Sequence, residues 1–327
     1  MENKEIKNEV VLPKFQMYTY PYERGTETTS RVMLDVIIAL IPAIIGSIYF
    51  FGIKVIPIYL VSILSCVLTE YIIQKVRKVP VKISDLSSVV TGILIAMNVP
   101  SEMPLYMMAF AGIFAVGVCK EAFGGIGSNF VNPALGGRTF LMASWGAAMT
   151  NYIAPGVVDG VASATPLQLL AEGATASDLP TIKDMFIGNI NGVIGETSAL
   201  LLLIGAIYLI IKKQIDIKIP LFYILSSLVL LPLFGVSLDL AIYYLLGGGL
   251  IMGAFFMATD YVTCPTTDKG KIIFAIGCGV ITTVIRVFGN MPEGVSYSIL
   301  FMNCMTPMID KYIQPRVFGE VKDKNER

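Results

Sequence analysis

Long apolar runs separated by short polar stretches dominate the chain from about residue 32 to residue 312. Runs near the roughly 20 residues that cross a bilayer predict about ten transmembrane helices. They lie at about 32–53, 55–76, 86–100, 104–120, 129–149, 192–211, 217–235, 238–258, 271–289 and 294–312. Some, such as 86–100, are short and interrupted by Gly, Asn or Pro, which is typical of broken or re-entrant segments buried in protein. The pattern therefore predicts an all-α polytopic membrane protein.

The distribution of basic residues predicts the orientation, because cytoplasmic loops are enriched in Lys and Arg. With an even helix count and a cytoplasmic amino end, 20 of the 24 Lys and Arg residues fall on the cytoplasmic side. Lys54 and Lys183 fall outside, and Arg138 and Arg286 lie within helical stretches. We therefore expect both termini in the cytoplasm of a bacterial cell, with the protein in its inner membrane.

The two halves of the chain carry a weak repeat. GIFAVGVCKEAFGG (112–125) and GVITTVIRVFGN (279–290) are both Gly-containing apolar segments that end in a cation followed by Phe-Gly. Five helices in each half would give the two repeats opposite orientations in the membrane. The predicted divisions are an amino-terminal arm (1–30), a first repeat (31–149), an external loop (150–190), a second repeat (191–313) and a tail (314–327).

Composition supports a membrane protein and excludes several kinds of site. Hydrophobic residues make up 55% of the chain, charged residues 15%, and the mean hydropathy is +0.72. The absence of His excludes imidazole metal ligands and a Ser/His/Asp triad. The five cysteines form no CxxC pair and predict buried thiols. Neither a phosphate-binding loop nor a basic patch for nucleic acid is present.

The segment KEAFGGIGSNFVNPALGGRTF (120–140) concentrates Gly and Asn in apolar surroundings. Glycines allow a flat ligand to approach the backbone, and the amides of Asn129 and Asn132 offer both donors and acceptors to a heteroaromatic ring. Tight helix packing through small residues, with Asn joining the helices, explains the same composition. Both interpretations remain open at this point.

Charged residues within apolar runs are candidates for function, since each is costly in lipid unless it is paired or hydrated. They are Glu70, Glu121, Arg138, Glu196, Asp260, Arg286, Glu293 and Asp310. Asp260 and Asp310 fall near helix ends, where water offers a plainer explanation. Arg138 and Arg286 each require an anion, either a carboxylate or a ligand phosphate.

Thr165 lies in the external loop, directly before Pro166 and three residues before Gln168. This spacing predicts a capping box, with Thr165 as the N-cap of a short helix. Nothing in the local sequence activates the Thr165 hydroxyl as a nucleophile.

Four motifs in order, from about Pro21 to Asp310, resemble the RnfD/NqrB family of membrane subunits. They are PYERGTETTSRVMLDVIIALIPA, KEAFGGIGSNFVNPA, MATDYVTCPTTDKG and IRVFGNMPEG with LFMNCMTPMID. The family includes subunits of Rnf complexes and of sodium-pumping NADH:quinone reductase. Because the chain lacks the longer amino-terminal extension of the quinone-reductase subunit, it is more similar to the D subunit of Rnf.

This resemblance implies FMN joined through its phosphate to a threonine on the outer side of the membrane. The family motif D-x-x-[ST]-G-A-T matches residues 159–165, except that Ala162 and Ser163 replace Ser/Thr and Gly. Thr165 is then the acceptor, and a separate flavin transferase makes the bond. The resemblance also implies a second, non-covalent riboflavin near Asn129 and Asn132.

The function implied is that of a membrane subunit of an Rnf-type ferredoxin:NAD⁺ oxidoreductase coupled to Na⁺ or H⁺ translocation. Arg138 or Arg286 would stabilise a flavin or its phosphate, and Asp260 and Asp310 would serve an ion pathway. Other Rnf subunits are the expected partners, because the chain has no ferredoxin, NAD or iron–sulfur site of its own. The alternatives are a flavin-free channel or permease, the B subunit of a sodium-pumping NADH:quinone reductase, and a structural anchor for partner subunits.

Overall fold

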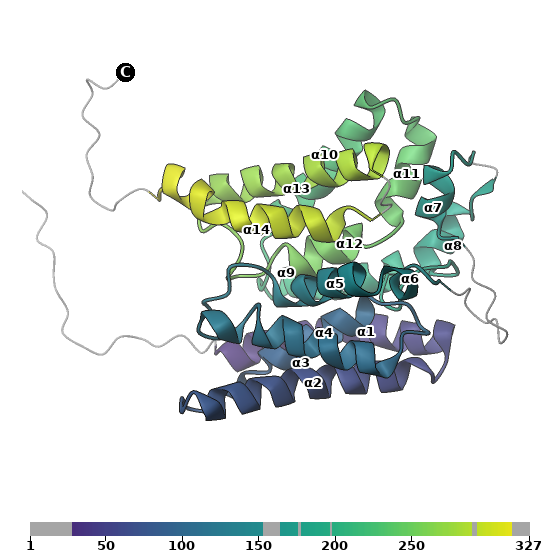
Figure 1. Cartoon of the computed structure of the whole chain (residues 1–327). Coiled ribbons are helices and arrows are strands. Elements are labelled where there is room, and N and C mark those ends of the chain that lie inside the picture. The colour runs from purple at the N-terminus through teal and green to yellow at the C-terminus, as the bar shows by residue number, and fades with distance from the viewer. Residues whose placement is uncertain (1–27, 153–163, 176–177, 197, 290–292, 316–327) are drawn as a thin grey trace, which may run out of the picture.

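A computed structural model describes residues 28–152, 164–175, 178–196, 198–289 and 293–315. Within these ranges the chain forms helices and turns and no strand (Figure 1). The first half contains α1 (Thr29–Phe51), α2 (Val55–Val76), η1 (Ile83–Asp85), α3 (Ser87–Met97), α4 (Leu105–Gly117), η2 (Glu121–Phe123), α5 (Pro133–Ser144) and α6 (Gly146–Met149). Two short helices follow, α7 (Pro166–Ala171) and α8 (Ile182–Ile187). The second half contains α9 (Ala199–Ile211), α10 (Lys218–Leu233), α11 (Leu238–Leu246), α12 (Leu250–Met252), η4 (Gly253–Met257), α13 (Asp268–Phe288) and α14 (Val295–Tyr312).

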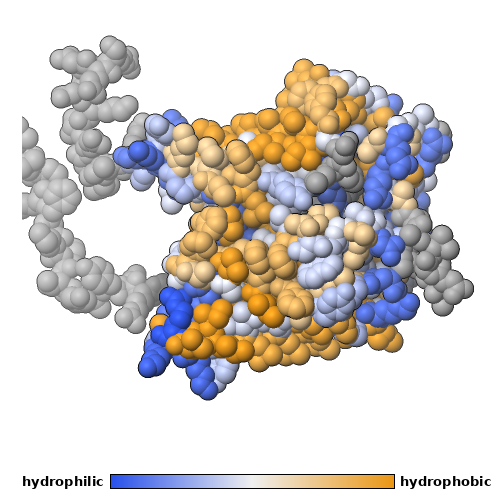
Figure 2. Space-filling view, in the orientation of Figure 1, coloured by the Kyte–Doolittle hydropathy of each residue, from blue (hydrophilic) through white to orange (hydrophobic). Residues whose placement is uncertain are grey.

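The chain is a helical membrane protein. In the described ranges, α1, α2, α13 and the segment Leu105–Phe123 are long and apolar enough to cross a membrane. A bent pair, Leu238–Leu246 with Leu250–Met257, makes a fifth candidate, and α3, α9 and α10 are shorter apolar helices. Hydrophobic residues cover the middle of the visible face and hydrophilic residues gather at its two ends, as expected for a bilayer-embedded surface (Figure 2).

Two predicted helices differ from the observed ones for clear local reasons. The helix predicted at 129–149 begins only at Pro133, because Asn132 is its N-cap, and it is interrupted at Trp145 before α6. The single helix predicted at 238–258 is instead two segments that meet at 63°, because the three glycines 247–249 interrupt it. It continues into η4, a π-helix in which the Ala258 amide donates to the Gly253 carbonyl.

In each half, one helix packs against two others. In the first half α2 contacts α3 and α4, and in the second half α10 contacts α11 and α13. Between the halves, α1 packs against α9, and α5 packs against α14. One hydrophobic core runs through both halves, and a smaller cluster joins α7, α8 and α11 at the end of the bundle on the right of Figure 1.

Candidate functional site

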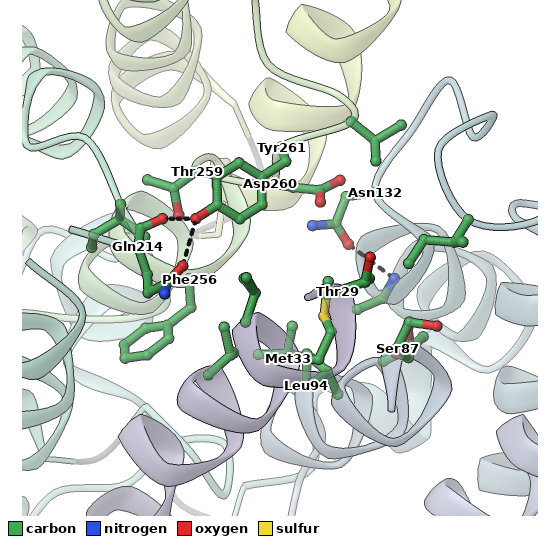
Figure 3. A pocket seen from close by; sticks show the side chains of 18 of the residues that line it. Thr29, Met33, Ser87, Leu94, Asn132, Gln214, Phe256, Thr259, Asp260 and Tyr261 are labelled. Atoms are coloured by element: carbon green, nitrogen blue, oxygen red, sulfur yellow. Dashed lines mark hydrogen bonds between the residues drawn. The ribbon is translucent and has the colours of Figure 1, made fainter. Parts of the chain in front are cut away.

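A cavity of about 850 Å³ lies where α1 begins and α9 ends. Both halves form its walls, with α1, α3 and residues 126–134 on one side and residues 209–215 and 255–262 on the other. Figure 3 shows polar side chains, among them Asn132, Asp260 and Gln214, converging between apolar ones. Cofactor pockets typically enclose roughly 300–1,000 Å³ between apolar walls with a few polar groups. The cavity therefore has the size and lining of a cofactor site.

The two predicted asparagines both line this cavity. Asn132 Oδ1 accepts from the amides of Ala134 (3.0 Å) and Leu135 (3.4 Å), which caps α5. Its Nδ2 donates to the carbonyl of Met257 at 3.1 Å and so joins the two halves. Asn129 Nδ2 donates to the Val131 carbonyl at 3.1 Å. The Asn132 amide thus joins helices, as one of the two interpretations from the sequence proposed. The side chains of Asn129 and Asn132 are also both part of the cavity wall.

The two predicted acidic residues take different positions. Asp260 lies in the cavity wall, in the turn between η4 and α13, and accepts from Thr263 Oγ1 at 3.0 Å. Burial raises the pKa of the Asp260 carboxyl above its ordinary value. Asp310 accepts from the amide (3.1 Å) and hydroxyl (3.2 Å) of Thr266, and it does not line the cavity. The structure therefore gives Asp310 a partner within the turn that carries Asp260.

A buried ion pair lies at the side of the cavity that α3 forms. Lys120 Nζ lies 2.7 Å from Glu70 Oε1, and it also donates to the hydroxyls of Ser87 (2.6 Å) and Ser88 (3.2 Å). Lys120 and Ser87 line the cavity. The three acceptors match the three N–H groups of an ammonium. The sequence placed Lys120 among the cytoplasmic loop cations and did not predict this position.

Arg138 lies in a second polar cluster, toward the end of the bundle that carries α7. Its guanidinium pairs with Glu293 and lies 3.6 Å from Glu196 Oε1. It also donates to Asn98 Oδ1 (3.1 Å) and to Ser296 Oγ (2.9 Å). The anions that the sequence required for Arg138 are thus carboxylates of the chain itself.

Arg286 uses backbone carbonyls in place of carboxylates. Its terminal nitrogens donate to the carbonyls of Tyr244 and Gly247, the latter at 3.3 Å. Its Nε is buried and has no hydrogen-bond partner within the described residues. A buried guanidinium with an unused N–H retains the capacity to bind an anion.

Thr165 is the N-cap of α7, as predicted from the sequence. Its hydroxyl accepts from the Gln168 amide at 3.3 Å, and the Gln168 side chain accepts from the Thr165 amide at 2.8 Å. Asn191 Nδ2 donates to the carbonyl of Ala164 at 3.2 Å and fixes the chain just before it. The rest of the attachment motif, residues 159–163, lies outside the described residues.

Arg286 and Leu167, a residue of the helix that Thr165 caps, approach the same glycine turn. A Cβ at Gly248 would lie 2.6 Å from the side chain of Leu167 and 3.2 Å from an Arg286 nitrogen. Leu167 belongs to the helix that Thr165 caps, so the glycine turn lies between this helix and the guanidinium. The structure thus brings the predicted acceptor and the predicted cation into one region.

The predicted residues therefore separate into two groups, at the cavity and near α7. The residues at the cavity that the sequence reasoning missed include Lys120 and Gln214 in the wall and Asp35 behind it. The rule that selects charged residues in apolar runs applies to Asp35 and would have found it.

The family described as NQR2, RnfD, RnfE family matches residues 16–319. The chain is 45% identical to the D subunit of the Na(+)-translocating ferredoxin:NAD(+) oxidoreductase complex of Acetobacterium woodii, over 94% of this chain and 96% of the relative. It is 42% identical to the D subunit of the proton-translocating ferredoxin:NAD(+) oxidoreductase complex of Clostridium ljungdahlii, over 93% and 96%. It is 32% identical to the D subunit of the ion-translocating oxidoreductase complex of Actinobacillus succinogenes, over 93% and 98%.

Proposed function

The chain belongs to the NQR2, RnfD, RnfE family, and from this membership we propose that it is the membrane D subunit of an Rnf-type ferredoxin:NAD⁺ oxidoreductase. The observation that carries the proposal is the match to D subunits along almost the whole length of both chains. The activity belongs to the assembled complex. The sodium-pumping quinone-reductase B subunit is the second candidate, since the same family includes NQR2.

The proposed topology has ten membrane spans in two inverted repeats. The protein lies in the bacterial inner membrane, with both termini in the cytoplasm. The corresponding helix partners in the two halves support it, as do the contacts of α1 with α9 and of α5 with α14. The broken segment of α11, α12 and η4 lies at the place in the second half that α3 takes in the first. The cavity then faces the cytoplasm, and Thr165 lies on the outer side.

The proposed cofactor at the outer side is FMN, esterified through its phosphate to Thr165. The residues fit this group, because the Thr165 hydroxyl is held at a helix N-cap and the nearby Arg286 Nε has no partner among the described residues. Arg286 would lie close to the phosphate, whereas Arg138 is already neutralised by two carboxylates of the chain and would act only by holding the neighbouring helices in place. A flavin transferase is the required maturation partner.

The proposed cofactor in the cavity is a second, non-covalent flavin. The volume of about 850 Å³ suits an isoalloxazine ring, and Asn129 and Asn132 lie in the wall. A bound flavin supplies the hydride and one-electron chemistry, whereas the protein binds, orients and shields it. The apolar side chains of the wall would pack against the ring, and Lys120 holds a buried positive charge at one side.

The coupling ion is Na⁺ or H⁺, since the relatives named above include one of each kind. Asp260, a carboxylate in the cavity wall, is the proposed ion-pathway residue closest to the ligand. Asp310 would act indirectly by holding the Thr266 turn.

The test is the intact mass of the purified chain after co-expression with a flavin transferase. We expect the added mass of one FMN less water, together with flavin fluorescence in a denaturing gel. Thr165→Ala should lose both. Thr181→Ala is the matched control, because Thr181 caps α8 in the same way, accepting from the Asp184 amide at 3.2 Å.

Retention of the flavin by Thr165→Ala would refute the attachment site. A wild-type chain without flavin would favour a flavin-free channel or permease. Unimpaired electron transfer by the assembled complex carrying Thr165→Ala would favour a structural anchor.

A further inference from the structure

Glu196 is a buried carboxylate whose Oε1 makes no hydrogen bond within the described residues. The residue is 5% exposed, and the amide of Gly195 before it donates to the Met97 carbonyl at 2.8 Å, which holds the chain against the end of α3. Arg138 Nη1 lies 3.6 Å from Glu196 Oε1, within the range of an ion pair but too far for a hydrogen bond. A buried polar atom without a partner requires a physical explanation.

Arg138 is engaged mainly by other groups. Its guanidinium pairs with Glu293, and its Nη1 donates to two uncharged side chains, an amide and a hydroxyl. The Tyr152 hydroxyl also donates to Glu293 Oε1, at 3.3 Å, and adds no positive charge. One guanidinium therefore faces two carboxylates, and the charge of Glu196 is left without a hydrogen-bonded cation.

Arg286 is the second cation near Glu196, and both side chains approach the glycine turn 247–249. A Cβ on Gly249 would overlap Glu196 Oε1, and a Cβ on Gly248 would lie 3.2 Å from an Arg286 nitrogen. The terminal nitrogens of Arg286 donate to backbone carbonyls at the end of α11. The charge of Arg286 favours the ionised form of Glu196 from a distance, as that of Arg138 does.

A proton is the ligand that suits Glu196 Oε1. Two guanidiniums nearby repel a metal cation, and the glycine turn packs directly against this oxygen. A proton adds almost no volume, neutralises the carboxylate and converts it into a hydrogen-bond donor. Buried acidic groups in membrane proteins often serve as proton relays for this reason.

Glu196 is connected to the proposed flavin attachment site by two contacts. Leu167, in the helix that Thr165 caps, approaches the same glycine turn as Glu196. Asn191 Nδ2 donates to the Ala164 carbonyl at 3.2 Å. Asn191 lies shortly before Glu196 in the sequence, and Ala164 directly precedes Thr165. A charge placed on a group at Thr165 therefore acts on a carboxylate in the same buried region.

We propose that Glu196 is a proton-binding site that compensates negative charge on the flavin proposed at Thr165. When one electron arrives there from a partner subunit, one proton from water binds Glu196 Oε1 and forms an O–H bond. The net charge of the region then stays constant. When the electron leaves for the next partner, the O–H bond breaks and the proton returns to water. This inference rests on the proposal that Thr165 carries FMN.

The first experiment records the infrared difference spectrum between the oxidised and the dithionite-reduced chain. The sample is the full-length, detergent-solubilised protein with FMN attached and with non-covalent flavin removed. We expect reduction to produce the carbonyl-stretching band of a protonated carboxylic acid, shifted in D₂O. Glu196→Gln should lack this band. Glu172→Gln is the matched control and should keep it, because Glu172 is an exposed carboxylate at the end of α7.

The second experiment measures the midpoint potential of the attached flavin as a function of pH. Glu196→Gln is permanently neutral, so at about pH 8 its potential should exceed that of the wild type by at least about 59 mV, a tenfold change for a one-electron step. The difference should vanish at low pH, where Glu196 is protonated in both redox states. Protons that the flavin itself binds affect both proteins equally. A merely structural role of Glu196 would not give a difference that depends on pH.

A potential of Glu196→Gln within about 18 mV of the wild type at about pH 8, a change of less than twofold, would overturn the inference. So would a carboxylic acid band that the wild type lacks or that Glu196→Gln retains. In these cases flavin on a denaturing gel still supports attachment at Thr165. If Glu196→Gln does not fold, Glu196→Asp replaces it, and an unshifted band would overturn the inference. A wild-type chain without covalent flavin would overturn the attachment proposal and the role of Glu196 together.

Discussion

Replacing Lys120 by Met is expected to destabilise the protein by about 3–5 kcal/mol, because it leaves a buried carboxylate without its cation. The side chains of Lys120 and Glu70 are only 3% and 1% exposed, and their charged atoms lie 2.7 Å apart. The same ammonium donates to Ser87 and Ser88, so three hydrogen bonds are lost at once. Met keeps most of the aliphatic stem, and the change in packing is therefore small beside the change in charge.

Thermal unfolding in detergent, followed with a dye that reacts with exposed thiols, measures this loss. Cys66 and Cys278 are fully buried, so dye labelling of these thiols reports loss of the fold. A loss of 3–5 kcal/mol corresponds to a decrease of roughly 6–20 °C in the unfolding temperature if soluble-protein scaling applies. Glu70→Gln combined with Lys120→Met removes the unpaired charge and should recover at least half of the decrease.

An unfolding temperature of Lys120→Met within about 1 °C of the wild type would refute the reasoning, since the ion pair would then contribute nothing measurable. A double variant as unstable as the single one would show that the loss comes from packing and not from the unpaired Glu70 carboxylate.

Two further variants test the contact between α1 and α9 and the wall of the cavity. Gly205→Val should destabilise the α1–α9 contact, because even a Cβ at this position would lie 2.0 Å from the Ala39 carbonyl. The thiol assay should show a lower unfolding temperature for this variant. An unchanged unfolding temperature would mean that the two helices do not pack this closely. Burial raises the pKa of Asp260, so its ionisation costs stability once the pH exceeds the ordinary carboxyl pKa. Asp260→Asn should therefore unfold at a higher temperature than the wild type at pH 8, and the difference should vanish below about pH 4, where the carboxyl is protonated in both states. A difference that persists at low pH would contradict this sign.

The apolar pattern predicted most helices within a few residues, because a bilayer imposes a minimum length on apolar segments. The observed ends follow from capping groups, which a hydropathy pattern does not weigh. Asn132 is the clearest example, since its side chain begins α5 four residues later than the apolar run suggested. Pro42 and Pro307 lie inside observed helices although proline usually ends them, as is tolerated in membrane spans.

The sequence indicated which residues are candidates for function more readily than it indicated which residues they contact. The sequence required an anion for Arg138 but left a carboxylate and a phosphate equally open, and only the fold brings Glu196 and Glu293 to it. Gln214 carries no signal in its local sequence, because its place in the cavity depends on a contact between α1 and α9 that joins the two halves. Contacts between residues this far apart follow from tertiary packing, which local periodicity does not contain.

The π-helix η4 sets which of the residues that directly follow it face the cavity. Each residue in a helix turns the chain by about 100°, so the one extra residue in this turn rotates everything after it by that angle. Thr259 and Asp260 follow directly and line the cavity. Deleting a single codon within 253–257 would leave the segment almost as long and equally apolar, yet it would turn these two side chains toward other neighbours. Such a deletion would impair ligand binding, although the protein would still insert into the membrane.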